Sequence, residues 1–219
     1  MTTSPVPTQE PQPTSAQETA IIEAARDLLA GGVEALSMRV VAERVGVSAA
    51  AIYHYFPSKQ ALVNRVVYLA FERFGGYLRQ AAESEPAGSL ERVVALGKAY
   101  LRFALENQAY FRVMFSIGAK DARTLGELPE GGGYHLLREA VAEAIAAGVL
   151  RGEDPDLLSM YLWSTVHGLV TLSLCGASER CQVDPLPSAI ELYERFYTFV
   201  ADGVRARGSS AALGERNIS

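Results

Sequence analysis

The residues best suited to chemistry lie between Ser37 and Leu62, a stretch that reads SMRVVAERVGVSAAAIYHYFPSKQAL. It combines small residues with closely spaced tyrosines, a histidine and a lysine. Small residues let a helix backbone approach the edges of DNA bases, while hydroxyl and ammonium groups can donate hydrogen bonds to phosphate oxygens. These residue types therefore predict contact with double-stranded DNA.

Two short helices joined by a tight turn would position these residues. Ser37 can cap the first helix, Gly46 supplies the backbone freedom for the turn, and Ser48 can cap the second helix. Pro57 ends the second helix and Ser58 begins a longer one. A pair of helices joined by a short glycine-containing turn is a helix-turn-helix unit, whose second helix enters the major groove of DNA.

The outward face of the second helix and the two flanking helix starts are expected to touch DNA. Tyr53 and Lys59 suit phosphate oxygens, whereas Arg39 could reach a phosphate or a guanine edge. For Tyr55, contact with DNA and packing within the domain both remain open. The predicted DNA-contacting residues are Ser37, Arg39, Ser48, Ala49, Ala50, Tyr53, His54 and Lys59. The inward face is predicted to pack on Leu28 and Leu29 through Val41, Val45, Val47, Ile52 and Phe56.

The segment from about Ala20 to Ala70 resembles the DNA-binding domain of the TetR family of bacterial transcriptional regulators. The matching motifs are Ala24-Ala25, Leu28-Leu29, Gly46-Val47-Ser48, Ile52-Tyr53-His54-Tyr55-Phe56 and Ser58-Lys59-Gln60-Ala61-Leu62. Ala51 departs from the family, which often has a hydroxyl or small polar residue there, and a basic residue common before the first helix is missing. The resemblance implies a C-terminal bundle that binds a small molecule and forms the dimer.

Helical periodicity continues through most of the chain and predicts an all-α protein. The expected organisation is a disordered arm over 1–15, a three-helix helix-turn-helix domain over 16–62, a linking fourth helix over 58–83, a ligand-binding and dimerisation bundle over 89–206, and a disordered tail over 207–219. The helices expected within the bundle are Ser89–Glu106, Ala109–Gly118, Gly133–Gly148, Pro155–Cys175 and Ser188–Ala206. The glycine-rich stretch 119–132 is expected to be a mobile loop.

A second resemblance concerns the bundle. The run from Trp163 to Gly168 resembles the Trp-x-x-x-His-Gly (WHG) signature of one TetR C-terminal subclass, and residues 106–115 resemble it too. Trp163 and His167 lie on one helical face because they are four positions apart. A ligand pocket would be formed by Phe111, Met114, Phe115, Trp163 and His167. The other interpretation is a packed core with one hydrogen-bonded histidine.

The last helix of the chain is apolar on two faces, so it needs two partners. One partner is its own domain, and the other is the same region of a second subunit, as expected for a protein that binds a two-fold symmetric DNA site. The predicted dimer interface comprises Leu158, Leu162, Leu169, Leu172, Tyr193, Phe196, Tyr197 and Val200.

Composition narrows the remaining possibilities. The formal charge of −5 argues against a general polyanion binder, although a site-specific reader can be acidic overall. Cys175 and Cys181 have no metal-ligand spacing, so neither a zinc site nor a cofactor is predicted, and both thiols suit a reducing cytoplasm. No segment reads as a signal peptide or a membrane span, and no catalytic constellation is found.

These observations favour a cytoplasmic, homodimeric, ligand-responsive repressor that binds operator DNA and an unknown small-molecule effector. A helical ligand-binding or scaffold protein that uses its helix-turn-helix for protein contacts is the alternative. Activation in place of repression also stays open, and an enzyme is not expected.

Overall fold

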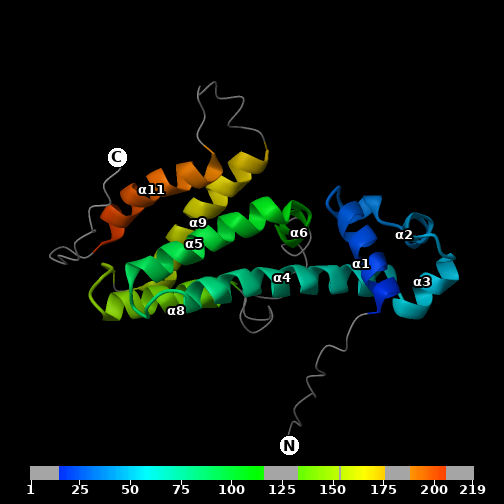
Figure 1. Ribbon diagram of the computed structural model, residues 1–219, viewed down its shortest axis with the longest axis horizontal. Coiled ribbons are helices and arrows are strands. Elements are labelled where there is room, and N and C mark those ends of the chain that lie inside the picture. The colour runs from blue at the N-terminus through cyan, green and yellow to red at the C-terminus, as the bar shows by residue number, and fades with distance from the viewer. Residues whose placement is uncertain (1–14, 116–132, 153, 176–187, 206–219) are drawn as a thin grey trace, which may run out of the picture.

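The computed structural model describes residues 15–115, 133–152, 154–175 and 188–205, and it is an elongated assembly of helices (Figure 1). Within these ranges every regular element is helical, apart from one isolated bridge between Leu150 and Arg205. The all-α prediction is therefore confirmed. The arm predicted over 1–15, except for Ser15, the loop over 119–132 and the tail over 207–219 all lie outside the described residues.

The N-terminal unit contains α1 (Ala16–Leu29), the short 3-10 helix η1 (Val33–Ala35), α2 (Met38–Val45) and α3 (Ala49–Tyr55). Its core is formed by fully buried aliphatic side chains from all three α-helices, including Ile21, Leu29, Val41 and Ile52. The predicted packing holds for Val41, Ile52 and Phe56, which are buried, while Val45 and Val47 are partly buried against the same core.

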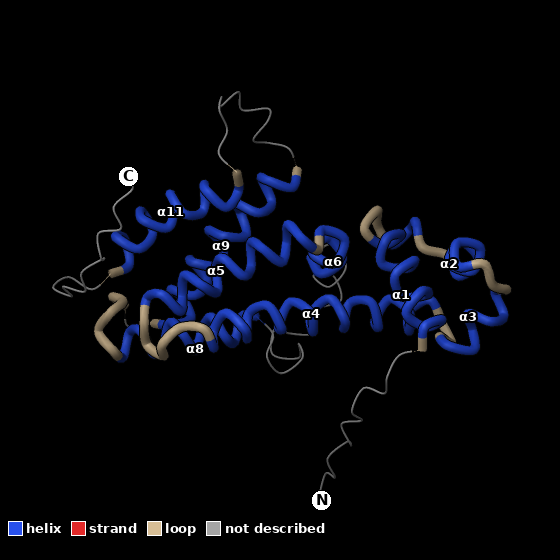
Figure 2. Tube along the Cα trace, in the orientation of Figure 1, coloured by secondary structure: helices blue, strands red, loops and turns tan. Residues whose placement is uncertain are grey.

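The turn between α2 and α3 is built as its residue types suggest. Gly46 has φ 73°, a left-handed conformation that favours glycine, and its N–H donates to the carbonyls that end α2. Ser48 then caps α3, its hydroxyl accepting from the Ala51 N–H. This geometry aims the two helices of the helix-turn-helix in different directions, as the tube trace shows (Figure 2).

Helix α4 (Lys59–Glu83) is the longest described element and belongs to both parts of the molecule. Its beginning packs against α1, and its later turns pack against α5 and α8 (Figure 1). A displacement at one end of such a helix is transmitted to the other, because the intervening backbone is hydrogen-bonded throughout. The helix predicted over 58–83 is therefore present, with Ser58 as its N-cap.

The C-terminal bundle consists of α5 (Leu90–Glu106), α6 (Gln108–Val113), α8 (Gly133–Ala146), α9 (Pro155–Leu174) and α11 (Ala189–Val204). The bounds agree with the predicted ranges within one or two residues, except for the end of α6. Met114 and Phe115 follow α6 in a π-helical turn, and the last predicted residues of that helix, 116–118, lie outside the described residues. Asp154 caps α9 as expected, with Pro155 in its first turn. Helices α5 and α8 pack on the later part of α4, and α9 and α11 lie on the side of α5 that faces away from α4 (Figure 1).

The outer side of α9 and α11 is unusually apolar. Leu157, Met160, Tyr161 and Leu172 of α9 and Ile190, Phe196 and Phe199 of α11 are exposed, and Phe199 is 75% exposed. Helix α9 is also long and apolar enough to cross a membrane by length and composition, although core helices of soluble proteins meet the same test. An apolar face of this extent predicts a partner that covers it.

Candidate functional site

The outward face of α3 carries the side chains predicted to meet DNA. Ile52 holds the helix to the core because it is fully buried, whereas Tyr53 is 51% exposed and His54 is also exposed. Ser48 and Ala50 lie on the exposed side of the same helix start, and Ala49 is half-buried. Helix α3 lies at the end of the molecule away from the bundle (Figure 1), so nothing in the described chain covers this face.

Tyr55, for which DNA contact and packing within the domain were both open, is partly exposed. It is 37% exposed, and its ring meets the His54 ring edge-on with 5.5 Å between centroids. The contact orients the histidine at the end of α3. Tyr55 is therefore not a core residue, and its hydroxyl stays available at the surface.

Helix starts flank α3 on both sides. Ser37 caps α2, accepting a hydrogen bond from the Val40 N–H at 3.2 Å, and Arg39 is exposed in the first turn of that helix. Ser58 caps α4 in the same way, accepting from the Ala61 N–H at 3.1 Å. Both helix starts present backbone N–H groups at the surface, which suits phosphate oxygens.

Lys59 is positioned differently from a free surface lysine. Its Nζ donates to the Val33 carbonyl oxygen at 3.0 Å, which ties the start of α4 to η1, and the side chain is half-buried. An ammonium group has three donors, so two remain for a phosphate. The contact fixes the position of the ammonium, which reduces the entropy lost when it binds an anion.

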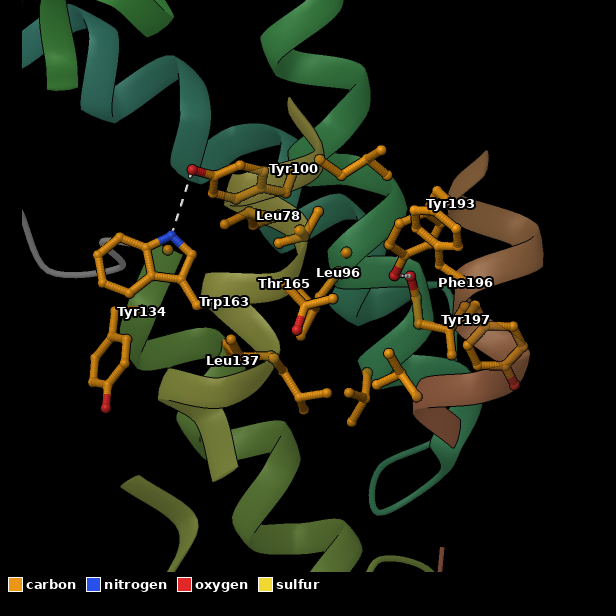
Figure 3. Close-up of a pocket in the computed structure, with 18 of the residues that line it drawn as sticks. Leu78, Leu96, Tyr100, Tyr134, Leu137, Trp163, Thr165, Tyr193, Phe196 and Tyr197 are labelled. Carbon is orange, nitrogen blue, oxygen red and sulfur yellow. Dashed lines mark hydrogen bonds between the residues drawn. The ribbon is translucent and has the colours of Figure 1, made fainter. Parts of the chain in front are cut away.

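The bundle contains a partly open cavity of about 210 Å³ between α4, α5, α8, α9 and α11. Trp163 and Tyr134 lie on one side of it, Tyr193, Phe196 and Tyr197 on the other, and Tyr100 above (Figure 3). Two glycines allow the walls to approach closely: a Cβ at Gly97 would collide with Tyr193, and one at Gly133 would collide with Phe74 and Leu78. The cavity is therefore shaped by specific contacts between helices.

The five predicted pocket residues divide between two sites. Met114, Phe115 and Trp163 line the cavity, whereas Phe111 and His167 line a separate, shallower hollow that Phe115 also borders. Arg112, Thr171, Leu174 and Cys175 complete this second hollow. The helical spacing of Trp163 and His167 placed them on one face of α9, but it could not show that Trp163 borders the cavity while His167 borders the other hollow.

Tyr100 of α5 joins the two sites through hydrogen bonds. Its Oη lies 2.7 Å from His167 Nδ1, and the Trp163 Nε1–H donates to the same oxygen at 3.4 Å. Burial lowers the pKa of His167, so the imidazole is neutral near physiological pH, and burial raises the pKa of Tyr100. The expected alternative of a hydrogen-bonded core histidine is thus compatible with the contacts seen. No sequence motif indicated Tyr100, because it approaches α9 only in the folded bundle.

Several residues predicted for the dimer interface face inwards. Leu162, Leu169, Tyr193, Tyr197 and Val200 line the cavity, and Leu158 packs on the core. Within one chain these side chains therefore contact their own bundle, and their role in a dimer interface stays a prediction. Of the two apolar stripes on α11, the one containing Tyr193 and Tyr197 packs towards α5, where the Tyr193 hydroxyl donates to the Val94 carbonyl. Leu172 is exposed as expected, and Phe196 is both exposed and part of the cavity wall.

Helix α6 connects the cavity to the DNA-binding domain. The Tyr110 ring is contacted by two guanidinium groups, with Arg26 of α1 at 5.1 Å and Arg73 of α4 at 5.8 Å from its centroid. Met114 and Phe115, directly after α6, line the cavity. A cation over an aromatic ring is attractive, so a shift of α6 is felt by α1 as well as by α4.

Among the described residues, no group of histidine, cysteine or acidic side chains could hold a metal ion. Tyr100 and His167 are paired with each other. The buried Ser159 hydroxyl of α9 has no hydrogen-bond partner within the described residues. The described residues thus combine an exposed face on α3 with an apolar cavity in the bundle.

Comparison with known proteins accounts for both parts of the chain. Residues 21–66 match the family described as bacterial regulatory proteins, tetR family, and residues 93–196 match the tetracyclin repressor-like C-terminal domain. The two matches cover the helix-turn-helix domain and most of the bundle. The subclass with the Trp-x-x-x-His-Gly signature is not identified by these matches.

Individual relatives agree with this result. The HTH-type transcriptional repressor KstR of Mycolicibacterium smegmatis is 34% identical over 121 residues, which span 54% of this chain and 57% of that protein. A protein of unknown function from Rhodococcus sp. RHA1 has a similar structure, with a TM-score of 0.71, 28% identity and coverage of 90% of this chain and 99% of that one. The ketosteroid transcriptional regulator KstR2 of Mycobacterium tuberculosis shares the fold, with a TM-score of 0.67 and 19% identity over 89% and 97% of the two chains. With its helix-turn-helix domain and its bundle both matched, the chain belongs to the TetR family of bacterial regulatory proteins.

Proposed function

We propose that this protein is a DNA-binding transcriptional regulator that acts as a repressor and is released from its operator by a small molecule. The observation that carries the proposal is the outward face of α3. It combines an alanine-rich start, the exposed Tyr53 and the exposed His54 on a helix fixed from behind by Ile52. The KstR relative is a transcriptional repressor, which supports repression over activation.

The residues proposed to contact DNA keep the roles that their chemistry suggests. Tyr53 and Lys59 bind phosphates, Arg39 binds a phosphate or a base edge, and the small residues at the start of α3 approach bases directly. Lys59 does this while also holding η1, since one of its protons is used by the Val33 carbonyl. Ser37, Ser48, Ala49, Ala50 and His54 complete the proposed surface.

The operator-binding form is proposed to be a homodimer. The exposed apolar residues of α9 and α11 give each subunit a face that a second copy would cover, and two recognition helices suit a two-fold symmetric DNA site. This face includes Leu172 and Phe196 of the predicted interface, together with Leu157, Met160, Tyr161 and Phe199. Covering these residues also accounts for the apolar character of α9 in a DNA-binding protein of the cytoplasm.

Effector control is proposed to pass through α6 and α4. A molecule in the cavity would touch Met114 and Phe115, and the Tyr110 contacts would transfer a shift of α6 to α1. The effector acts only through its different affinity for the two arrangements of the bundle. The finer assignment to the Trp-x-x-x-His-Gly subclass is supported by Trp163 and His167, which share Tyr100 as a hydrogen-bond partner.

Binding to the DNA upstream of the protein's own gene tests the proposal. Fluorescence anisotropy with labelled fragments of that region should show saturable binding to one fragment that weakens steeply as salt is raised. An unrelated fragment of equal length is the control. Equal affinity for both fragments would exclude an operator there and would favour the alternative of a helix-turn-helix used for protein contacts.

A further inference from the structure

The charge of the cavity wall restricts what can bind inside it. No Asp, Glu, Lys, Arg or His is found among the described residues that line the cavity. An ion moved from water into such a site loses its hydration, and without an opposite charge nothing offsets that loss. A carboxylate or a phosphate group is therefore a poor occupant of the described cavity.

The few polar groups of the wall are hydroxyls. Thr165 Oγ1 donates to the Tyr161 carbonyl oxygen at 2.9 Å, and Tyr193 Oη donates to the Val94 carbonyl oxygen at 3.1 Å. Each oxygen keeps lone pairs that can accept a hydrogen bond. Thr165 lies between the Trp163 wall and the Tyr193 wall (Figure 3), so its hydroxyl is placed to accept from a small polar group of a ligand.

The remaining tyrosine hydroxyls at the cavity are aimed elsewhere or already paired. The Tyr100 hydroxyl is held by His167 and Trp163, and the Tyr134 hydroxyl donates to the Asp156 carbonyl at 3.4 Å. The Tyr197 hydroxyl points away from the centre of the cavity (Figure 3). The rest of the wall is aliphatic or aromatic and gains most from an apolar ligand.

The cavity volume limits the size of the occupant. An apolar protein cavity of roughly 150 Å³ takes up benzene. The volume of about 210 Å³ is larger, and it suits a compact ring system or a medium-length chain. We infer that the effector is an uncharged, largely apolar molecule of about eight to ten carbon atoms, with one hydroxyl group seated at Thr165.

This inference rests on the proposed function in one respect, because it takes the cavity to be the effector site. Trp163 is the only tryptophan of the chain and lines the cavity, so its fluorescence reports occupancy directly, without DNA. The probes are 1-octanol and octanoate, which have equal chain length and differ in charge at about pH 8. We expect 1-octanol to bind at least about tenfold more tightly than octanoate.

Two variants locate the bound probe. Val93→Phe fills part of the cavity and should weaken 1-octanol binding, while circular dichroism verifies that the helices are retained. Thr165→Val removes the hydroxyl at nearly constant volume and should weaken 1-octanol binding by about two- to tenfold. Thr198→Val is the matched control, because Thr198 also donates to a backbone carbonyl, that of Arg195, but is exposed and outside the cavity wall. It should leave the affinity unchanged.

Three results would overturn the inference: octanoate binding as tightly as 1-octanol, no change of Trp163 fluorescence with either probe, or the same 1-octanol affinity in Val93→Phe. The proposed function is tested separately by measuring DNA affinity in the same samples. If 1-octanol occupies the cavity and the DNA affinity stays constant, the ligand class stands and the effector role fails. If a charged molecule releases DNA, the effector role stands and the ligand class fails.

Discussion

The DNA-binding domain and the C-terminal bundle distribute their apolar residues in opposite ways. In the N-terminal domain Ile21, Leu29, Val41 and Ile52 are fully buried in one small core. The exposed face of α3 is small and carries polar side chains. In the bundle the core contains a cavity, and large apolar side chains such as Leu157 and Phe199 lie on the outside. The first has a filled core, whereas the second contains a cavity and an exposed apolar face.

This difference in packing indicates that the N-terminal domain and the bundle respond differently to a ligand. A fully packed domain keeps the residues of α3 in one arrangement, so its contribution to DNA affinity is constant. A bundle with unfilled volume can repack around a ligand at low cost, so it is the part that changes. Helix α4 and the Tyr110 contacts are the physical connection between the two.

The largest effect is expected from removing the phosphate contacts of the DNA-binding domain. Tyr53→Ala combined with Lys59→Ala should weaken operator binding by about 100-fold, since a hydrogen bond to a charged group contributes about 1.5–3 kcal/mol. Lys59→Ala alone should also reduce the salt slope by about one. Anisotropy titrations at several salt concentrations measure both quantities. Lys98→Ala, an exposed lysine of α5, is the control. Unchanged DNA affinity in the double variant would remove this surface from the proposed interface.

The next effect concerns the outer face of the bundle. Phe199→Glu places a charge at the most exposed apolar residue of α11 and should raise the dimer dissociation constant at least about tenfold. Sedimentation velocity over a range of protein concentrations gives this constant. Thr198→Glu adds the same charge at the neighbouring exposed position and should have a smaller effect. A dimer that tolerates both substitutions equally would have its interface elsewhere.

A moderate effect is expected for the link between the two regions. Arg26→Ala removes one cation from the Tyr110 ring and should reduce the change of operator affinity caused by effector, by about 0.5–2 kcal/mol of coupling free energy. Arg65→Ala is the matched control, because Arg65 stacks on Tyr68 within α4 itself and links no second helix. DNA affinity with and without effector gives the coupling for each variant. Full coupling in Arg26→Ala would show that α6 communicates by another route.

The smallest effect is expected from pH. Burial lowers the pKa of His167 in the folded protein, so the unfolded chain binds a proton more readily at this residue. Its contribution to stability is therefore present above the unfolded pKa of about 6.5 and is lost as the pH falls below that value. Thermal unfolding between about pH 8 and pH 5 should show a shallower decline for His167→Gln than for the wild type. Identical slopes would mean that His167 does not titrate differently in the folded state.

The sequence predicted those elements whose structure depends on residues close together in the chain. The caps Ser37, Ser48 and Ser58 and the turn at Gly46 each act within a few positions, so their spacing predicted α2, α3 and the start of α4. It did not predict that Lys59 would reach Val33, because that contact joins segments 26 positions apart in the sequence.

Most of the cavity could not be predicted from local sequence patterns. Trp163 and Phe115 were identified from a motif, but Tyr100, Thr165 and Gly97 come together only when α5 and α9 pack. Periodicity also showed two apolar stripes on α11 without showing which one faces inwards. That orientation depends on the fit between Tyr193 and Gly97, which no local pattern records.

Hydroxyl-radical footprinting of the operator tests the central claim most directly, namely that two copies of α3 bind DNA at a spacing held by the bundle. The wild-type protein should protect two patches related by two-fold symmetry, with their centres one helical turn of DNA apart or a multiple of it. The Phe199→Glu protein should lose this paired pattern at concentrations where it is monomeric. A single continuous footprint, or an unchanged pair of patches from a monomeric variant, would contradict the account.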